Sequence, residues 1–222
     1  AIVLTAAGTD VLCSGGLTGT IDAVAVGGNG SFTFVWQGCN GGALLSGAAQ
    51  SGLSTGCYAV TATDANGCTR SDSVTVNEPL PFNVTGSTNP VTCYGGSNGS
   101  AGVSVGGAQP PYNYIWGTGN TTPSVGNLPA GIVPVTIVDF VGCQTVFQLE
   151  VLQPPALQVV NFQSIPVGCF GDSTSSATIT TNGGILPYQY LWSDGQTNAT
   201  ATDLPAGLYT VTVTDFNGCT TT

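Results

Sequence analysis

Cysteine is the residue type in this chain whose spacing most clearly suggests chemistry. The chain has 222 residues, 8 cysteines and no histidine. Three cysteines stand at one fixed distance before a tryptophan, in the pairs Cys13 and Trp36, Cys93 and Trp116, and Cys169 and Trp192. An even number of cysteines in a chain rich in glycine, serine and threonine is typical of an oxidising compartment. We therefore expect disulfides.

Each of three similar segments has one cysteine before its second strand and one after an Asn-Gly or Val-Gly turn. The spacing predicts three bridges, each inside its own segment: Cys13–Cys68, Cys93–Cys143 and Cys169–Cys219. Closing a loop of about 50 residues would stabilise such a segment by roughly 4 kcal/mol in the entropy model. Without histidine or a Cys-x-x-Cys motif, a zinc site does not fit. We expect no metal and no cofactor.

Cys39 and Cys57 occur in the first segment alone, around a glycine-rich stretch with additional residues. One interpretation is a second disulfide that steadies a longer loop. The other is a loop ordered in advance for binding, because binding residues often lie on loops held by a rigid scaffold.

An aspartate stands four residues before the second cysteine of each segment, as Asp64, Asp139 and Asp215. Calcium binding needs clustered carboxylates and carbonyls, and each turn supplies one carboxylate. A side chain that accepts hydrogen bonds from its own turn explains the recurrence with fewer assumptions. We therefore expect a turn cap here.

Aromatic residues recur on one strand of each segment, in FTFVW, YNYIW and YQYLW. Exposed in a row, they could stack on sugar rings. A segment of this size also needs a large core residue, and tryptophan buries much apolar area. We favour the core interpretation for Trp36, Trp116 and Trp192.

Catalysis lacks its usual residues in this sequence. There is no histidine or lysine to act as a base, and paired cysteines leave no free nucleophile. We predict that the chain is not an enzyme and assign no catalytic residue.

The segments that position these residues form a tandem repeat. We place the boundaries at 1–78, 79–153 and 154–222, with the last strand of the third repeat cut short at Thr222. Each repeat shows alternating runs of β-branched residues bounded by glycine, proline and asparagine, which indicate short antiparallel strands packed as a sandwich.

Composition restricts the partners. One basic residue faces 11 acidic ones, so nucleic acid and anionic membrane surfaces are unsuitable partners. No apolar run is long enough to insert into a membrane. No basic segment precedes an apolar stretch, and we expect the chain to be a mature or excised piece.

Two stretches, CYGGSNGSAGVSVGGAQPPYNYIW at 93–116 and CFGDSTSSATITTNGGILPYQYLW at 169–192, together with LPAGLYTVTVTDFNGC at 204–219, closely resemble the SprB repeat. The first repeat departs from this pattern, since GSFTFVW replaces PYxYxW and LPAG is missing before Cys57. The resemblance covers essentially the whole chain in three copies.

This resemblance implies an all-β fold of tandem immunoglobulin-like sandwich domains. It also implies export by type IX secretion and display on the cell surface in an adhesin filament, which moves during bacterial gliding. The implied partners are extracellular surfaces or polysaccharide, neighbouring repeats and the secretion and gliding machinery, the last through regions outside this segment. A carbohydrate-binding module or a passive spacer of another secreted protein are the alternatives.

The same resemblance implies O-glycosylation of serine or threonine after aspartate. Ser73 and Ser173 follow aspartates and fit this short pattern. Unmodified surface serines are the alternative.

Overall fold

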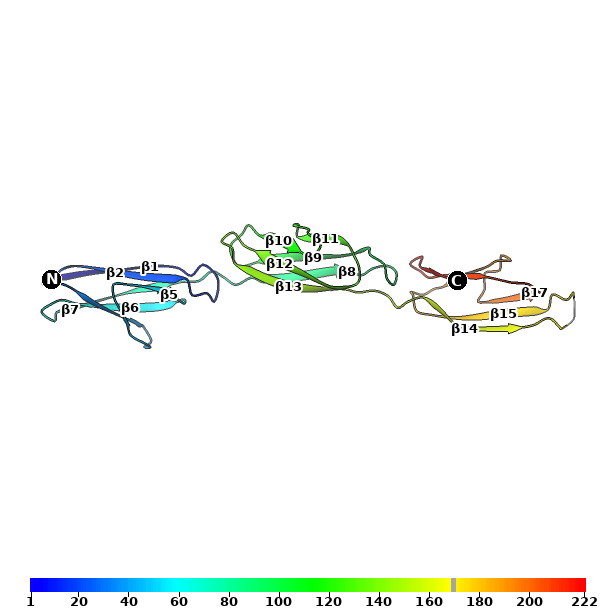
Figure 1. The fold of residues 1–222 in the computed structure, drawn as a ribbon, viewed down its shortest axis with the longest axis horizontal. Helices are drawn as coiled ribbons and strands as arrows, with labels where there is room; N and C mark the ends of the chain where they lie inside the picture. The colour runs from blue at the N-terminus through cyan, green and yellow to red at the C-terminus, as the bar shows by residue number, and fades with distance from the viewer. Residues whose placement is uncertain (169–170) are drawn as a thin grey trace. The chain divides into compact units, whose positions relative to one another are not determined.

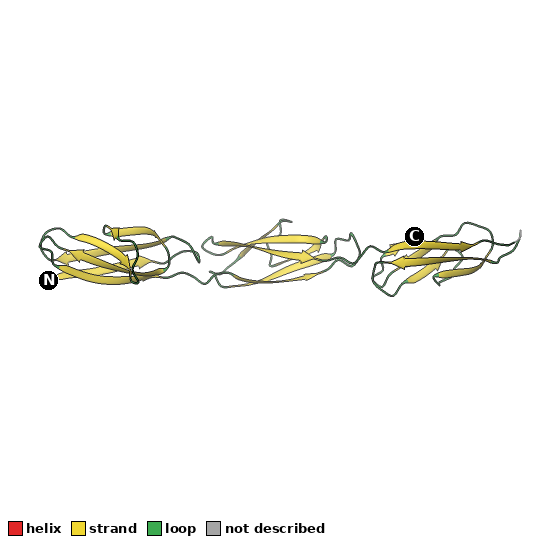
Figure 2. Cartoon of the chain, turned by 90° about the horizontal axis from the view of Figure 1, so that it is seen from below, coloured by secondary structure: helices red, strands yellow, loops and turns green. Residues whose placement is uncertain are grey.

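Residues 1–168 and 171–222 are described by a computed structural model of the chain. Every regular element among them is a β-strand, as Figure 2 shows in yellow. No helix in this part of the chain has the length and hydropathy needed to cross a membrane.

The first repeat contains seven strands in two sheets. One sheet has the strand order β1-β2-β5 and the other has the order β4-β3-β6-β7. Each pair of neighbouring strands in these two sheets is antiparallel. The strands are β1 (Ile2–Thr9), β2 (Gly19–Gly27), β3 (Thr33–Gly38), β4 (Leu45–Ser46), β5 (Ala49–Leu53), β6 (Gly56–Thr63) and β7 (Thr69–Val76), and Figure 1 labels most of them.

The second repeat reproduces this plan with two three-stranded sheets, β11-β9-β8 and β10-β12-β13. Its strands are β8 (Asn83–Asn89), β9 (Gly99–Gly106), β10 (Asn113–Trp116), β11 (Ser124–Leu128), β12 (Gly131–Val138) and β13 (Gln144–Val151). The predicted all-β sandwich of immunoglobulin type is therefore confirmed.

The third repeat has the sheets β14-β15-β17 and β16-β18-β19. Its strands are β14 (Gln158–Ile165), β15 (Ser175–Asn182), β16 (Gln189–Trp192), β17 (Thr200–Leu204), β18 (Val211–Thr214) and β19 (Thr220–Thr221). The two residues of β19 stand where β7 and β13 have eight each.

Alternation along the strands explains how each sandwich obtains its core. In β2, every second residue from Gly19 to Ala23 is buried and the residues between them are partly or fully exposed. The core of the first repeat consists of Leu4, Val11, Ile21, Ala23, Trp36, Val60, Ala62 and Val76. A matching cluster in the third repeat contains Ala177, Ile179, Trp192, Ala201, Leu204 and Val213.

The three tryptophans are core residues. Trp36, Trp116 and Trp192 expose 0, 2 and 3% of their surface. Each indole N–H donates to a main-chain carbonyl further along the chain, that of Gly47, Thr122 or Asn198, at 2.8–3.1 Å. Buried on all sides, these rings offer no face to a sugar, and the core interpretation is confirmed.

The chain also divides into two compact units. One comprises Ala1–Thr85, Val105–Tyr114 and Thr136–Val146, and the other comprises Gly86–Ser104, Ile115–Val135 and Phe147–Thr222. Three segments of the second repeat, 79–85, 105–114 and 136–146, thus belong to the same compact unit as the first repeat. The three-repeat boundaries remain a prediction.

The third repeat has an open cleft of about 320 Å³ where the other repeats carry their last strand. Phe162 and Ser175 line it and correspond to Gly86 and Gly99 of the second repeat. A side chain at Gly86 would lie 2.7 Å from Leu149 of β13, and one at Gly99 would lie 2.6 Å from Val151. The cleft therefore occupies the position of a strand equivalent to β13.

We predict that extending the chain after Thr222 with Asp-Ser-Val-Thr-Val, the sequence of the last part of β7, stabilises the third repeat. Burial of the two valines should add about 2 kcal/mol to the free energy of unfolding. Hydrogen–deuterium exchange of β18 measures the gain. An extension with glutamine at both valine positions is the control, and equal protection by both extensions would contradict the assignment of the cleft.

Candidate functional site

The cysteines form two kinds of turn. Cys13 and Cys93 begin what we call the Gly-Gly turns, residues 13–16 and 93–96. In each, the N–H of the second glycine donates to the cysteine carbonyl, at 2.9 and 3.0 Å. The first glycine has φ of 71° in both turns, a conformation that favours glycine. The first glycine of the Cys-x-Gly-Gly sequence is thus favoured by the shape of this turn.

The second cysteine of each repeat ends what we call an Asp turn, residues 64–68, 139–143 and 215–219. In all three, carboxylate oxygen Oδ1 of the aspartate accepts the N–H of the cysteine, at 2.8–2.9 Å. It also accepts the N–H of the residue two positions after the aspartate, at 2.9–3.1 Å. The turn-capping role expected for Asp64, Asp139 and Asp215 agrees with this geometry.

The other carboxylate oxygen, Oδ2, joins each Asp turn to the loop between the second and third strands of the same repeat. It accepts the N–H of Asn29, Gln109 or Ile185, at 2.9–3.2 Å. The three aspartates are buried, and their oxygens already accept main-chain donors. Among the described residues, no three histidine, cysteine, aspartate or glutamate side chains gather as metal ligands do.

The disulfides connect one kind of turn to the other across a repeat boundary. Cys13 of the first repeat is bonded to Cys143 of the second, with Cα atoms 5.6 Å apart. Cys93 of the second repeat is bonded to Cys219 of the third, with Cα atoms 5.7 Å apart. Each bond lies within one compact unit of the chain.

The predicted bridges Cys13–Cys68, Cys93–Cys143 and Cys169–Cys219 are therefore wrong. Cys68 is an exposed free thiol, and the partners of Cys93 and Cys143 lie in neighbouring repeats. Cys219 is bonded to Cys93, and Cys169 lies outside the described residues.

The physical reason is the direction of the first and last strands. The N–H of Ala6 donates to Asp72, and the N–H of Val11 donates to the carbonyl of Asn77, at 2.9 and 2.8 Å. From Ala6 to Val11 the first chain segment moves forward by five residues, and its hydrogen-bond partner moves forward by five residues as well, from Asp72 to Asn77. The strands β1 and β7 therefore run in the same direction. Cys13 follows the end of β1 and Cys68 precedes the start of β7. An eight-residue strand of about 26 Å therefore separates them, far more than a disulfide spans.

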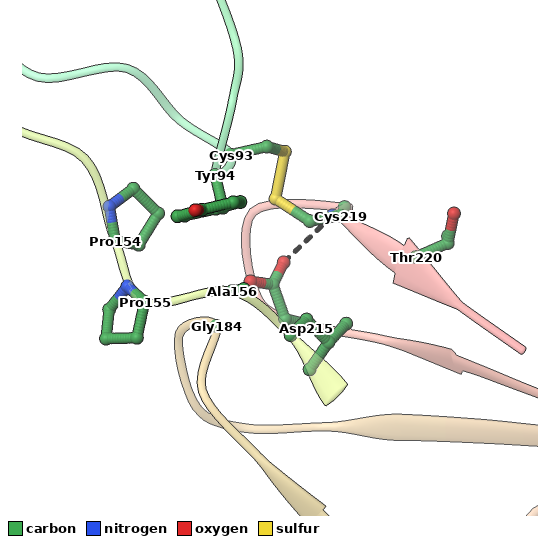
Figure 3. A pocket seen from close by; sticks show the side chains of 11 residues that line it. Cys93, Tyr94, Pro154, Pro155, Ala156, Gly184, Asp215, Cys219 and Thr220 are labelled. Carbon is green, nitrogen blue, oxygen red and sulfur yellow. Dashed lines mark hydrogen bonds between the residues drawn. A yellow bond between two sulfur atoms is a disulfide. The ribbon is translucent and has the colours of Figure 1, made fainter. Parts of the chain in front are cut away.

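Small clefts flank the two disulfides that join consecutive repeats, which we call the junction disulfides. The cleft beside Cys93–Cys219 has a volume of about 370 Å³, and Figure 3 shows the Tyr94 ring near Pro154 and the hydrogen bond from Cys219 to Asp215. The cleft beside Cys13–Cys143 has a volume of about 480 Å³ and is lined in the corresponding way by Ser14, Pro79 and Asp139. At both places a proline joint, a Gly-Gly turn and an Asp turn meet.

Polar contacts to main-chain carbonyls accompany the bonds between sulfurs. The side-chain amide of Asn217 donates to the carbonyl of Thr92 at 2.8 Å, and Cys219 Sγ lies 3.5 Å from the same oxygen. At the other junction Cys143 Sγ lies 3.4 Å from the carbonyl oxygen of Leu12. The residue before each Gly-Gly-turn cysteine thus contacts the Asp turn of the next repeat.

Cys39 and Cys57 form a disulfide with each other inside the first repeat. The N–H of Cys39 donates to the carbonyl of Cys57 at 3.0 Å, next to the paired residues Gly38 and Tyr58 of β3 and β6. The bond closes the base of the segment that carries β4 and β5. This geometry matches a brace for the longer loop, and binding by the loop remains a hypothesis.

The two serines considered for glycosylation are both exposed. Ser73 lies in the middle of β7, and its N–H donates to its neighbour Asp72 at 2.9 Å. Ser173 lies in the segment before β15. Their modification remains a proposal.

We predict that Cys13→Ser releases the thiol of Cys143. Chymotryptic peptides prepared below pH 7 without reductant should contain a Cys13–Cys143 pair in the unchanged chain. In the variant, alkylation should label Cys143 in addition to Cys68. If the substitution instead left Cys143 protected, the pairing described above would be wrong.

A second prediction concerns acid stability. The N–H of Cys68, supported by those of Asn29 and Asn66, holds the pKa of Asp64 below its ordinary value. A carboxyl group whose pKa is lower in the folded state stabilises the fold above its unfolded pKa, and this contribution is lost as pH falls through the folded pKa. The protection of β6 should therefore decrease on acidification below about pH 4.

The variant Asp64→Asn should weaken the acid dependence of β6 protection, because the group that titrates is gone. Hydrogen exchange corrected for the intrinsic effect of pH measures this. Asp22→Asn, at an exposed position of β2, is the matched control and should retain the dependence. The same slope in both variants would assign the acid sensitivity to other groups.

Comparison with solved structures found weak likenesses to immunoglobulin-domain proteins. The N-terminal eight Ig domains of Down Syndrome Cell Adhesion Molecule (DSCAM) isoform 1.30.30 share 12% identity at a TM-score of 0.45, over 96% of this chain and 34% of that one. The chain thus spans about a third of that structure. The Ig1 and Ig2 domains of DIP-gamma share 10% identity at 0.38, over 68% and 97%.

A tetra-tandem repeat from the extending region of a large adhesion protein shares 15% identity at a TM-score of 0.26, over 99% of this chain and 72% of that one. A comparison with curated proteins gave no match. The family model of the SprB repeat matches three times, at residues 5–42, 85–121 and 161–197. Each match begins in the first strand of a repeat and includes its first cysteine and its tryptophan, and these matches show that the chain belongs to the SprB repeat family.

Proposed function

We propose that this chain is a non-enzymatic segment of a large cell-surface adhesin and that it carries tension along its length. Membership of the SprB repeat family supports this assignment. The observation that carries it is the pair of disulfides that join consecutive repeats. A segment of an adhesin is loaded along its chain, and covalent bonds between repeats keep that load from unravelling them.

The order of the two bonds limits how far the chain can be drawn out. The shortest covalent route from Cys13 to Cys219 crosses to Cys143, returns along the chain to Cys93 and crosses to Cys219. That route contains about 50 residues, which extend to roughly 170 Å. The direct chain between the two ends would extend to roughly 700 Å. Most of the sequence is therefore shielded from tension.

The low charge of the chain suits contact with varied surfaces. Only 5% of residues are charged, so electrostatic repulsion from another surface is weak. We further propose that the parent adhesin acts outside the cell on surfaces or polysaccharides, is exported by type IX secretion and takes part in gliding. These finer assignments rest on what the family resemblance implies.

Single-molecule stretching tests the proposal that the chain carries tension. When the oxidised chain is held at both ends and fully unfolded, the distance between Cys13 and Cys219 should not exceed the length of the short covalent route. Addition of a reductant should then increase this distance several-fold, to the length of the direct chain. The double variant Cys13→Ser with Cys93→Ser is the matched control and should extend fully without reductant. Equal extension of the oxidised chain and this variant would refute the proposal.

A further inference from the structure

We propose that Cys68 forms a third disulfide of the kind that joins consecutive repeats. Its partner is the Gly-Gly-turn cysteine of another SprB-type repeat placed before Ala1. Formation of this disulfide does not depend on whether the chain acts in adhesion. Its basis is a comparison of the three Asp turns within the chain.

The Asp turn of the first repeat has the same geometry as the two that are bonded. The N–H of Asp64 donates to the carbonyl of Cys68 at 3.0 Å, and the equivalent bonds at Asp139 and Asp215 measure 2.9 Å. The carboxylate bonds to the cysteine N–H are likewise equal to within 0.1 Å in the three turns. Cys68 is therefore held as its bonded counterparts are, and no rearrangement of the turn is needed for pairing.

The three turns differ in what covers the cysteine. Cys143 exposes 8% of its surface and Cys219 is half-buried, and each is bonded to the preceding repeat. Cys68 is exposed, as are the turn residues Ala65 to Gly67 beside it. In both places where a repeat precedes the Asp turn, its Gly-Gly-turn cysteine occupies the position that is open at Cys68.

A second feature of the turn points to the same occupant. Asn217 of the third repeat uses its side-chain amide to bind the carbonyl before Cys93. The first repeat has Asn66 at the corresponding position, and its side-chain amide is exposed. The first repeat thus has both groups with which the third repeat holds its predecessor.

The start of the chain lies beside this turn. Ile2 is paired with Gly27, and the next residue, Gly28, lies so close to Asp64 that an added Cβ would be 3.1 Å from its carboxylate. At the first junction Pro81, which corresponds to Ala1, lines the cleft beside Cys143 together with the two residues before it. A repeat attached to Ala1 would therefore enter next to Cys68, as the first repeat leads into the second next to Cys143.

The bond forms by thiol–disulfide exchange with a disulfide oxidant such as oxidised glutathione. One cysteine thiolate attacks the oxidant, releases one glutathione and forms a mixed disulfide. The other thiolate attacks that mixed disulfide and releases the second glutathione. The two cysteine sulfurs are oxidised, the oxidant is reduced to two thiols, and the two protons end on the glutathione sulfurs.

The test joins a copy of residues 79–156 directly to Ala1 of the full chain, so that the copy's own joint leads into the first repeat. After refolding with oxidised glutathione, iodoacetamide labelling and non-reduced peptide mapping locate the thiols. Labelling of Cys68, complete in the unextended chain, should be lost, and a peptide pair linking it to the copied Cys93 should appear. The copied Cys143 should then be the labelled Asp-turn cysteine.

Replacing the copied Cys93 by serine is the matched control and should restore labelling of Cys68. The bonds Cys13–Cys143 and Cys93–Cys219 report that the extended chain has folded. Should they be absent, a copy of residues 1–80 that carries its natural joint and the substitution Cys68→Ser replaces the first extension, so that the original Cys68 alone is read out. Persistent labelling of Cys68 in both extended chains, a bond between the two copied cysteines, or a Cys68–Cys68 dimer overturns the proposal.

Discussion

The structure depends on the mismatch between the length of a strand and the reach of a disulfide. Cα atoms joined by a disulfide lie about 6 Å apart, whereas an eight-residue strand is about 26 Å long. In the first repeat β7 lies between the positions of Cys13 and Cys68, and in the second β13 separates Cys93 from Cys143 in the same way. The two recurring cysteines of one repeat therefore cannot meet, and the bonds Cys13–Cys143 and Cys93–Cys219 join cysteines of adjacent repeats.

This constraint changes what the cysteines stabilise. A bridge inside a repeat would restrict the unfolded chain of that repeat alone. The bonds observed here close loops with sequence separations of 130 and 126 residues and include parts of two repeats each. In the entropy model each such loop contributes about 5 kcal/mol. The two loops share the segment from Cys93 to Cys143, and the two bonds together therefore link all three repeats.

The repeats also serve as natural variants of one another. The Asp turn keeps its geometry with the cysteine bonded, at 143 and 219, and with the cysteine free, at 68. The shape of the turn is therefore fixed by the buried carboxylate and the main-chain donors around it. The disulfide then connects turns that are already ordered, which reduces the conformational entropy lost when it forms.

The sequence predicted much of the interior of the repeats. Alternation of apolar residues predicts strands of the kind seen in β2, β6 and β7, and the recurring aromatic strand predicts that the tryptophans lie in the core. The short strands β5, β11 and β17 have apolar residues that do not alternate, and the sequence pattern does not predict them. In β11, for example, the register shifts between the buried Val125 and Leu128, and glycine and asparagine lie between them.

By itself the sequence determined that the chain is a tandem β repeat, that its aspartates cap turns and that its cysteines recur at fixed places. The tertiary structure decided which cysteines are joined. Sequence spacing measures distance along the chain, and strand direction decides at which end of a sandwich each residue lies. The parallel course of β1 and β7 puts the two recurring cysteines of a repeat at opposite ends, and only the folded chain brings Cys13 to Cys143 and Cys93 to Cys219.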